Sequence, residues 1–336
     1  MPSSPRDLPV WALAAASLRA GTPVALLCVV RSEGSSPGRQ GFKMCVTAAA
    51  VAGSIGGGVM EHKWVELARQ RLASSDTTPL LRPQVHRREA PTDRSGLMCS
   101  GEQDVLLWPL TAADLAATAR IEELLQRHAP GHLAFSLAGG LQVQAGTLSA
   151  VSGTPTDFYQ YDAGPGWRYR EQLGFHDQLT IVGGGHVSLA LSRAVAPLGF
   201  EITVLDDRPD LPTLEANDAA HFRRMVAYET VAAEIPPGPR RYVVVMTVGY
   251  RTDAVVLRQL LGGAQQGQPY CYLGVMGSVA KVSELRRGLQ EAGIAAERIA
   301  RLRGPIGVPI NSQTPEEIAI SIAAELIQAR HEKPQR

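Results

Sequence analysis

The sequence predicts an α/β protein whose C-terminal half is a Rossmann-like, doubly wound parallel sheet, preceded by a mixed α/β N-terminal domain. From about residue 177 onward, short apolar strands alternate with amphipathic helices, the pattern of a parallel sheet with right-handed crossovers. The first of these strands, LTIV, runs directly into a glycine-rich turn and a helix, as in a dinucleotide-type βαβ unit. The length of 336 residues fits two domains, which we expect at 1–174 and 175–336.

The N-terminal half is less regular. It opens on an expected helix that ends at Gly21, and Arg19 argues against a signal peptide because a small-residue cleavage site belongs there. Two strands flank a Gly/Ser/Pro loop over residues 22–47, and a helix is expected over 60–73. Residues 74–95 are polar and contain prolines, which predicts a loop. Residues 131–175 alternate short β-like pieces with Gly and Pro and form a β-rich end of the first domain. The opening helix buries one face: Trp11, Ala14, Ala15 and Leu18.

The C-terminal half predicts five strands in the segments LTIVG, EITVLDD, RRMVAY, RYVVVMTVG and CYLGVMGS. A helix is expected over 186–198, and the later strands are each followed by a helical pattern. In the last helix, Thr314 is the expected N-cap, Pro315 occupies the first position and Glu317 completes a capping box. Its expected buried stripe is Ile318, Ile322 and Leu326.

Composition narrows the class of protein. Residues are 45% hydrophobic and 19% charged with a formal net charge of +1, which argues against a nucleic-acid surface because such domains carry a marked basic excess. No apolar run reaches the roughly 18 residues needed to span a bilayer. We therefore expect a cytoplasmic protein with neither nucleic acid nor membrane as its partner.

The glycine turn at 183–185 has the features of a nucleotide site. Gly183 permits the tight turn, Gly185 lets a pyrophosphate approach the backbone, and His186 lies in the turn. Asp206 ends the next strand, where an acid holds a ribose hydroxyl pair. Ser188 stands where the motif has its third glycine. The alternative is a Rossmann-like domain whose glycines make the turn and bind no dinucleotide.

A second candidate anion loop follows the fifth strand, in GVMGSVAK. Gly277 and Ser278 open a helix there, and Lys281 lies one turn in, so that backbone amides and a cation meet a phosphate. An ordinary strand-to-helix turn with a solvated lysine explains this local sequence equally well.

Cysteines and histidines show no metal or hydride-transfer pattern. Three cysteines (Cys28, Cys45 and Cys271) occupy apolar, strand-like runs, which favours buried structural roles. Cys99 differs because it lies between glycines in the loop RSGLMCSGEQD. The chain has neither zinc-ligand spacing nor the acid/base set that a dehydrogenase needs.

Two further glycine loops stand in the first half, GSSPGRQGFKM (34–44) and GSIGGGVMEH (53–62). Arg39 and Lys43 lie near them, and Glu61 starts a helix. Such loops suit an anionic, hydrogen-bonding ligand, and tight turns in a small β-rich domain explain them equally well.

Over almost its whole length the chain resembles the XdhC/CoxI family, accessory proteins that mature molybdenum hydroxylases such as xanthine dehydrogenase. The resemblance is carried by the two N-terminal glycine loops, the cysteine–glycine loop at 99–101, and the C-terminal segments VGGGHVSLALSRAVAPLGFEITVLDDR, YVVVMT, YLGVMGSVAK and RGPIGVPINSQTPEEIAISIAAEL. It implies a chaperone that binds molybdenum cofactor (molybdopterin carrying the metal), protects it during sulfuration and inserts it into an apo-hydroxylase of the xanthine dehydrogenase type.

The resemblance also implies partners and site residues. A cysteine desulfurase and a second copy of the chain, forming a homodimer, are expected partners. Cys99 is placed near the molybdenum or its sulfur, as a metal contact, and no other catalytic residue is implied. The residues expected to shape the first-domain loop are Lys43, Gly56, Gly57, Gly58 and Glu61.

The sequence departs from the family pattern at two places. The family often has T-H-x-H-x-x-D after the fourth strand, whereas this chain has Val248 and Tyr250 at the histidine positions and keeps Asp253. Ser100 stands where the family commonly has glycine. The alternative functions are an NAD(P)-dependent oxidoreductase and a nucleotide-binding regulator, and whether Asp207 or Arg208 selects a 2′-phosphate stays open.

Overall fold

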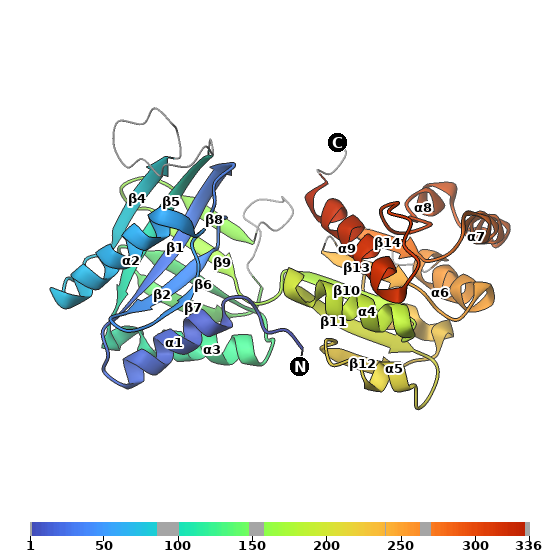
Figure 1. Cartoon of the computed structure of the whole chain (residues 1–336), viewed down its shortest axis with the longest axis horizontal. Helices are drawn as coiled ribbons and strands as arrows, with labels where there is room; N and C mark the ends of the chain where they lie inside the picture. Colours follow the sequence, from blue (N-terminus) through green and yellow to red (C-terminus); the bar gives the residue numbers. More distant parts are fainter. Residues whose placement is uncertain (1, 86–100, 148–157, 239, 263–269, 333–336) are drawn as a thin grey trace. The chain divides into compact units, whose positions relative to one another are not determined.

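The computed structural model describes residues 2–85, 101–147, 158–238, 240–262 and 270–332. The chain folds as two compact units. We call Ser4–Gly174 the N-terminal unit, and Phe175–Arg336 together with the first three residues the C-terminal unit (Figure 1). Within the described ranges, no helix has the length and apolar character to cross a membrane.

The N-terminal unit is built on an antiparallel sheet in the order β3-β2-β1-β5-β4. At its centre β1 pairs with β5: Val24 lies opposite Leu110 at one end of this pair, and Gly34 lies opposite Gly101 at the other end. The glycine loops therefore belong to the Gly34–Gly101 end. The strands are β1 (Val24–Gly34), β2 (Lys43–Thr47), β3 (Val51–Gly53), β4 (Leu80–Val85) and β5 (Gly101–Leu110).

Strand β1 is buried on both faces, because successive side chains point to opposite sides of a sheet. Ala25, Leu27 and Val29 pack with the helix α2 (Gly58–Ala73). Alternate residues such as Leu26 pack into a second core. That core is shared with the helices α1 (Leu8–Arg19) and α3 (Leu115–Gln126), and with a four-stranded antiparallel sheet in the order β7-β6-β9-β8. The strands of that sheet are β6 (Gly131–Ser136), β7 (Gly140–Ala145), β8 (Tyr159–Asp162) and β9 (Arg168–Gln172).

Strand β4 corrects the expected loop over residues 74–95. Leu80 to Val85 pair with β5 from Leu107 to Glu102. Pro83 hid this strand in the sequence, but β4 is the edge of its sheet, where a residue without an N–H donor is tolerated. Residues 86–95 lie outside the described part of the chain.

The C-terminal unit confirms the predicted parallel sheet, in the order β12-β11-β10-β13-β14. All four pairings between neighbouring strands are parallel. The order places β10, the first strand, at the centre, so that the chain reverses direction across the sheet between β10 and β13. The strands are β10 (Asp177–Val182), β11 (Phe200–Asp206), β12 (Phe222–Met225), β13 (Arg241–Val245) and β14 (Tyr272–Val275).

Helices cover both faces of this sheet (Figure 1). On one face α4 (His186–Val195) and α9 (Pro315–His331) pack over Ile181 and Val244. On the other, α6 (Tyr250–Gly262) and α7 (Val279–Glu291) pack over Val243 and Val245. Shorter elements connect them: the helices α5 (Pro212–Glu215) and α8 (Ala296–Ala300), with 3₁₀ turns at Ala196–Leu198 and Tyr228–Ala233.

The predicted start of the last helix is confirmed. The Thr314 side chain accepts a hydrogen bond from the Glu317 N–H at 3.2 Å, and the Glu317 carboxylate accepts one from the Thr314 N–H at 3.1 Å. This reciprocal capping box satisfies backbone donors that a helix start otherwise leaves unpaired.

Candidate functional site

The structure brings the three glycine motifs of the N-terminal unit together. A Cβ added to Gly38 would lie 2.1 Å from the Ile55 carbonyl oxygen, and one added to Gly56 would lie 2.4 Å from the Gly38 nitrogen. A Cβ added to Gly101 would lie 2.3 Å from the Ser36 nitrogen. Contacts this close require glycine, so the loops at 34–41 and 53–58 and the start of β5 pack backbone against backbone in one cluster, which we call the glycine cradle.

Two side chains hold the cradle in shape. The Glu61 Oε2 atom accepts hydrogen bonds from the Ser54 hydroxyl at 2.6 Å and from the backbone N–H groups of Ile55 and Gly57, both at 2.9 Å. From the other side, the buried Gln103 accepts through its Oε1 from the Gly38 N–H at 3.0 Å. Glu61 therefore organises the second loop through charge-assisted bonds to the loop's own backbone.

The cradle opens onto the start of α2. Gly57 is the N-cap residue and, within the described part of the chain, no side chain caps this helix. Gly57 and Gly58 have φ values of +77° and +72°, and a Cβ on either would meet nothing within 4 Å. Open space therefore adjoins Gly57 and Gly58 at the positive end of the helix dipole, where an anion is favoured. The Glu61 carboxylate already accepts from the Gly57 N–H there.

Lys43, which we expect to shape the first-domain loop, is buried at the base of the cradle. It is the first residue of β2, and its side chain is 0% exposed. Its ammonium contacts Asp7 Oδ2 at 2.7 Å and Glu171 Oε1 at 2.5 Å, and donates to the Gly41 carbonyl at 2.9 Å. All three donors of the ammonium are thus taken, so Lys43 holds the base of the cradle rather than contacting a ligand.

In the C-terminal unit, Gly183 lies where β10 and β13 diverge. Its φ is +111°, and an added Cβ would lie 2.3 Å from the Met246 carbonyl oxygen and 3.0 Å from the Thr247 Cα. On the other side of the turn, the Gly184 N–H donates to Asp206 Oδ2 at 2.6 Å. Ligands of doubly wound sheets bind in this crevice at the carboxyl ends of the strands.

The carboxylate of Asp206, which we expect to hold a ribose hydroxyl pair, accepts hydrogen bonds from groups of the chain itself. It is 0% exposed. Oδ1 accepts from the Arg208 N–H at 2.9 Å and Nε at 2.8 Å, and Oδ2 accepts from Arg208 Nη2 at 2.8 Å besides Gly184. Burial acts to raise the pKa of Asp206, but the hydrogen bonds from Arg208 and Gly184 outweigh it and lower that pKa.

The second candidate anion loop also forms an internal ion pair. Ser278 is the N-cap of α7, with its hydroxyl accepting from the Lys281 N–H at 3.2 Å. The Lys281 ammonium contacts the buried Asp253 Oδ2 at 2.5 Å, and a Cβ on Gly277 would lie 2.6 Å from the Lys281 Cδ. The side chain of Lys281 is 22% exposed, so this lysine is neither free in solvent nor fully withdrawn from the surface.

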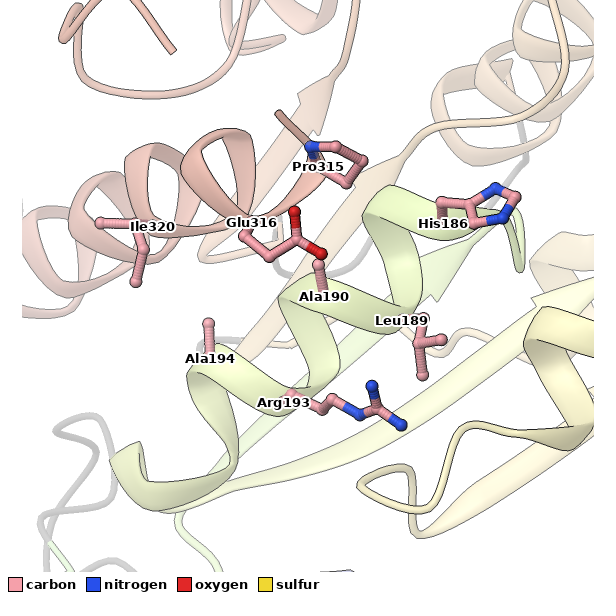
Figure 2. Close-up of a pocket in the computed structure, with 8 residues that line it drawn as sticks. All are labelled: His186, Leu189, Ala190, Arg193, Ala194, Pro315, Glu316 and Ile320. Carbon is pink, nitrogen blue, oxygen red and sulfur yellow. The ribbon is translucent and has the colours of Figure 1, made fainter. Parts of the chain in front are cut away.

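His186 lines a surface hollow of about 260 Å³ between α4 and α9. Figure 2 shows it at the N-terminal end of α4, with Pro315 and Glu316 at the start of α9 across the hollow. Its other lining residues are Leu189, Ala190, Arg193, Ala194 and Ile320. Gly185 and Ser188 lie beside it in sequence, and Ser188 is buried at the packing position where the motif has its third glycine.

Several residues that shape these sites gave no sequence signal. Asp7, Gln103 and Glu171 belong to segments whose local pattern predicts no site, and each acts on a residue at least 36 positions away. Cys99 and Ser100 lie outside the described residues, although Gly101 is part of the cradle. Among the residues that the structure describes, no group of three or more His, Cys, Asp or Glu side chains is placed to hold a metal ion.

Comparisons with known proteins match both units. The family model described as "XdhC and CoxI family" matches residues 17–83, and the one described as "XdhC Rossmann domain" matches residues 179–326. The uncharacterized protein YqeB of Escherichia coli K12 is 35% identical over 168 residues, which cover 48% of this chain and 29% of YqeB. A Bacillus subtilis 168 protein named as a probable subunit of xanthine dehydrogenase is 28% identical over 153 residues, which cover 46% of this chain and 43% of that protein. The matched part thus spans less than half the length of either relative.

A solved structure has the same fold over nearly the whole chain. The crystal structure of a xanthine dehydrogenase from Bacillus halodurans superposes with a TM-score of 0.69 and 22% identity, covering 96% of this chain and 97% of that one. At this identity the likeness concerns the fold. Together with the two family models, which match the two halves in order, it leads to one conclusion: the chain belongs to the XdhC/CoxI family and carries the XdhC Rossmann domain.

Proposed function

We propose that the chain is a maturation factor that binds molybdenum cofactor as its cargo, shelters it during sulfuration and delivers it to a hydroxylase of the xanthine dehydrogenase type. The observation that carries this proposal is the glycine cradle, in which Gly38, Gly56 and Gly101 from three separate motifs lie against backbone of the neighbouring loops at the start of α2. Family membership and a relative named as a probable xanthine dehydrogenase subunit support the choice of client.

The chemistry of the cradle suits this cargo. Molybdopterin combines a phosphate, a pterin with many donors and acceptors, and a dithiolene that oxidises readily. A helix N-terminus with open N–H groups binds phosphate, and glycine backbone gives a flat, hydrogen-bonding ligand close access to main-chain donors and acceptors. Glu61 holds the loop that presents these groups in place through three hydrogen bonds.

Cys99 remains the proposed contact to the molybdenum or its sulfur. It precedes Gly101 by two residues in the sequence, and Gly101 lies against Ser36 in the cradle. A thiol accepts sulfur from the persulfide of a donor protein by thiol exchange, which is why a cysteine desulfurase is a proposed partner. A homodimer is likewise proposed from the family alone.

Replacing Glu61 tests the proposal. We expect Glu61→Ala, purified anaerobically from a molybdenum-replete host, to retain less than about a tenth of the wild-type pterin and molybdenum. In this variant three donors of the loop lose their acceptor, and each donor left unsatisfied costs about 1–3 kcal/mol. Glu66→Ala is the matched control: it lies on the same helix, and its described ion pair is with Arg69 at the surface, so it should retain cargo as wild type does. Equal retention by both variants would remove the cradle from the proposal.

Replacing Cys99 tests the sulfur step separately. We expect Cys99→Ser to bind pterin but to yield a client hydroxylase with little activity after transfer, because the serine hydroxyl cannot carry sulfur. Inorganic sulfide added to the transferred cofactor should then restore activity. Unchanged sulfuration by Cys99→Ser would remove the role proposed for this thiol.

A further inference from the structure

The end of β11 is where a Rossmann-like domain selects between ribose forms. An unphosphorylated ribose needs an acid there to accept hydrogen bonds from its 2′- and 3′-hydroxyls. Asp206 occupies this position, but its two oxygens already accept four hydrogen bonds, three of them from Arg208. A carboxylate has about four acceptor sites, so none is left for a ribose diol while Arg208 stays in place.

Arg208 places a partly exposed guanidinium at the same position. Its side chain is 39% exposed, whereas its partner Asp206 is 0% exposed. The side-chain bonds to Asp206 use Nε and Nη2. Among the residues that the structure describes, this leaves Nη1 of the guanidinium to donate to a ligand. Because the Asp206 carboxylate is buried and the guanidinium is the exposed member of the pair, an incoming ligand meets the guanidinium rather than the Asp206 carboxylate.

A buried hydroxyl beside this pair also keeps its proton for donation. Tyr228 is 2% exposed, and its hydroxyl donates no hydrogen bond to any described residue. Burial, and then the charges of Asp206 and Asp207, raise the pKa of Tyr228. The phenol is therefore a neutral donor close to the carboxylates of Asp206 and Asp207.

The glycine turn adjoins Asp206, the residue to which Arg208 is paired. Gly184 contacts Asp206 through its N–H, and its neighbour Gly183 abuts Met246 and Thr247. Gly185, which follows Gly184, is the N-cap residue of the ten-residue helix α4, and no described side chain caps this helix. The turn therefore offers a place for a diphosphate, with the Arg208 guanidinium to one side of it.

We propose that Arg208 makes the end of β11 and the adjoining glycine turn a site for an adenine dinucleotide that carries a 2′-phosphate, in preference to the unphosphorylated form. The phosphomonoester forms charge-assisted hydrogen bonds to the guanidinium. The unphosphorylated ribose instead must displace Arg208 from Asp206. This site is in the C-terminal unit and does not depend on cargo binding in the glycine cradle.

Direct titration of the full-length chain tests the proposal. We expect NADPH to bind at least about tenfold more tightly than NADH, a difference of about 1.4 kcal/mol. In competition against NADPH, 2′-AMP should displace it at lower concentration than 5′-AMP or inorganic phosphate. The Arg208→Gln variant should lose the preference, with weaker NADPH binding and NADH binding that is unchanged or tighter.

Arg287→Gln is the matched control, because Arg287 is an exposed arginine of the same unit whose described ion pairs are with the exposed Glu284 and Glu291. It should keep the wild-type preference. Equal affinity for NADPH and NADH, no binding of either up to about 1 mM, or a preference that survives in Arg208→Gln would each overturn the assignment. Displacement by inorganic phosphate as effective as that by 2′-AMP would reveal a plain anion site and overturn it too. Because the ligand comparisons use the wild-type chain, they decide the question even if Arg208→Gln does not fold.

Discussion

Lys43 and Glu171 are 128 residues apart in the sequence, yet Lys43 Nζ lies 2.5 Å from Glu171 Oε1 in the core of the N-terminal unit. The pair joins β2 of the first sheet to β9 of the second. Asp7, just before α1, supplies a second carboxylate at 2.7 Å, and the Gly41 carbonyl at the end of the first glycine loop accepts the third bond. One buried ammonium thus connects both sheets, the first helix and the base of the glycine cradle.

Removing this ammonium should destabilise the N-terminal unit severely. In Lys43→Met, Asp7 and Glu171 remain buried without their shared cation, which costs about 3–5 kcal/mol when one partner of a buried pair is lost. Denaturant titration measures the free energy of unfolding. Lys63→Met, at an exposed position of α2, should change it by less than about 0.5 kcal/mol, and a loss below about 1 kcal/mol in Lys43→Met would contradict this account of the cluster.

The stability of the same cluster should depend on pH through Glu171. Burial and the charge of Asp7 raise the pKa of Glu171 from 4.5 to about 7, although the attraction of Lys43 opposes this increase. The folded state therefore binds this proton more tightly than the unfolded state, so the contribution is fully present below about pH 4.5 and is lost as the pH rises through about 7.

We expect the unfolding free energy of the wild type to fall by the order of 2 kcal/mol across that window relative to Glu171→Gln. Burial acts to raise the pKa of Asp7, but the charges of Lys43 and Arg6 outweigh it and lower that pKa. Asp7 therefore affects the stability only at more acidic pH. Parallel pH profiles of the two proteins would argue against a raised pKa at Glu171.

Two glycines of the turn at 183–185 should respond differently to substitution by alanine. Gly183 has φ of +111° and no room for a Cβ beside Met246, whereas Gly185 has φ of −71° and nothing within 4 Å. Gly183→Ala should cost at least about 2 kcal/mol through backbone strain. Gly185→Ala should cost less than about 1 kcal/mol, as an N-cap change. Thermal unfolding compares them, and similar losses in both would show that the turn is not built as described.

Asp253 should contribute more to stability than an ordinary surface acid. Its Oδ1 accepts from the Thr247 N–H at 3.0 Å and from the Thr247 hydroxyl at 2.5 Å, and its Oδ2 contacts Lys281 at 2.5 Å. Asp253→Ala should cost about 2–4 kcal/mol because these donors lose their partner, and Asp253→Asn should cost less. Glu284→Ala removes only an exposed ion pair and should leave the free energy of unfolding nearly unchanged. An equally small loss in Asp253→Ala would refute the role given to Asp253.

The Rossmann-like half was predictable because its signals are local. Strand, glycine turn, helix and second strand follow one another within about 30 residues, and the capping box at Thr314 ends at Glu317. What the sequence did not reveal depends on contacts between distant segments. Edge strand β4 was hidden by Pro83, and the burial of Lys43 requires Asp7 and Glu171 from other elements.

The chemistry of a correctly located residue was harder still to predict. Asp206 ends β11 as predicted. Its role, however, depends on Arg208, whose side chain turns back after the end of the strand and donates to the Asp206 carboxylate. In the cradle, the glycines marked the loops, whereas the close backbone contacts at Gly38, Gly56 and Gly101 required the fold of the sheet.

Anaerobic purification of the wild-type chain from a molybdenum-replete host tests the central claim most directly, with molybdenum and pterin measured on the same sample. The account predicts both in near-stoichiometric amount per chain, together with transfer of the cofactor to an apo-hydroxylase. A folded protein that carries neither molybdenum nor pterin, and takes up neither when the cofactor is supplied, would contradict it.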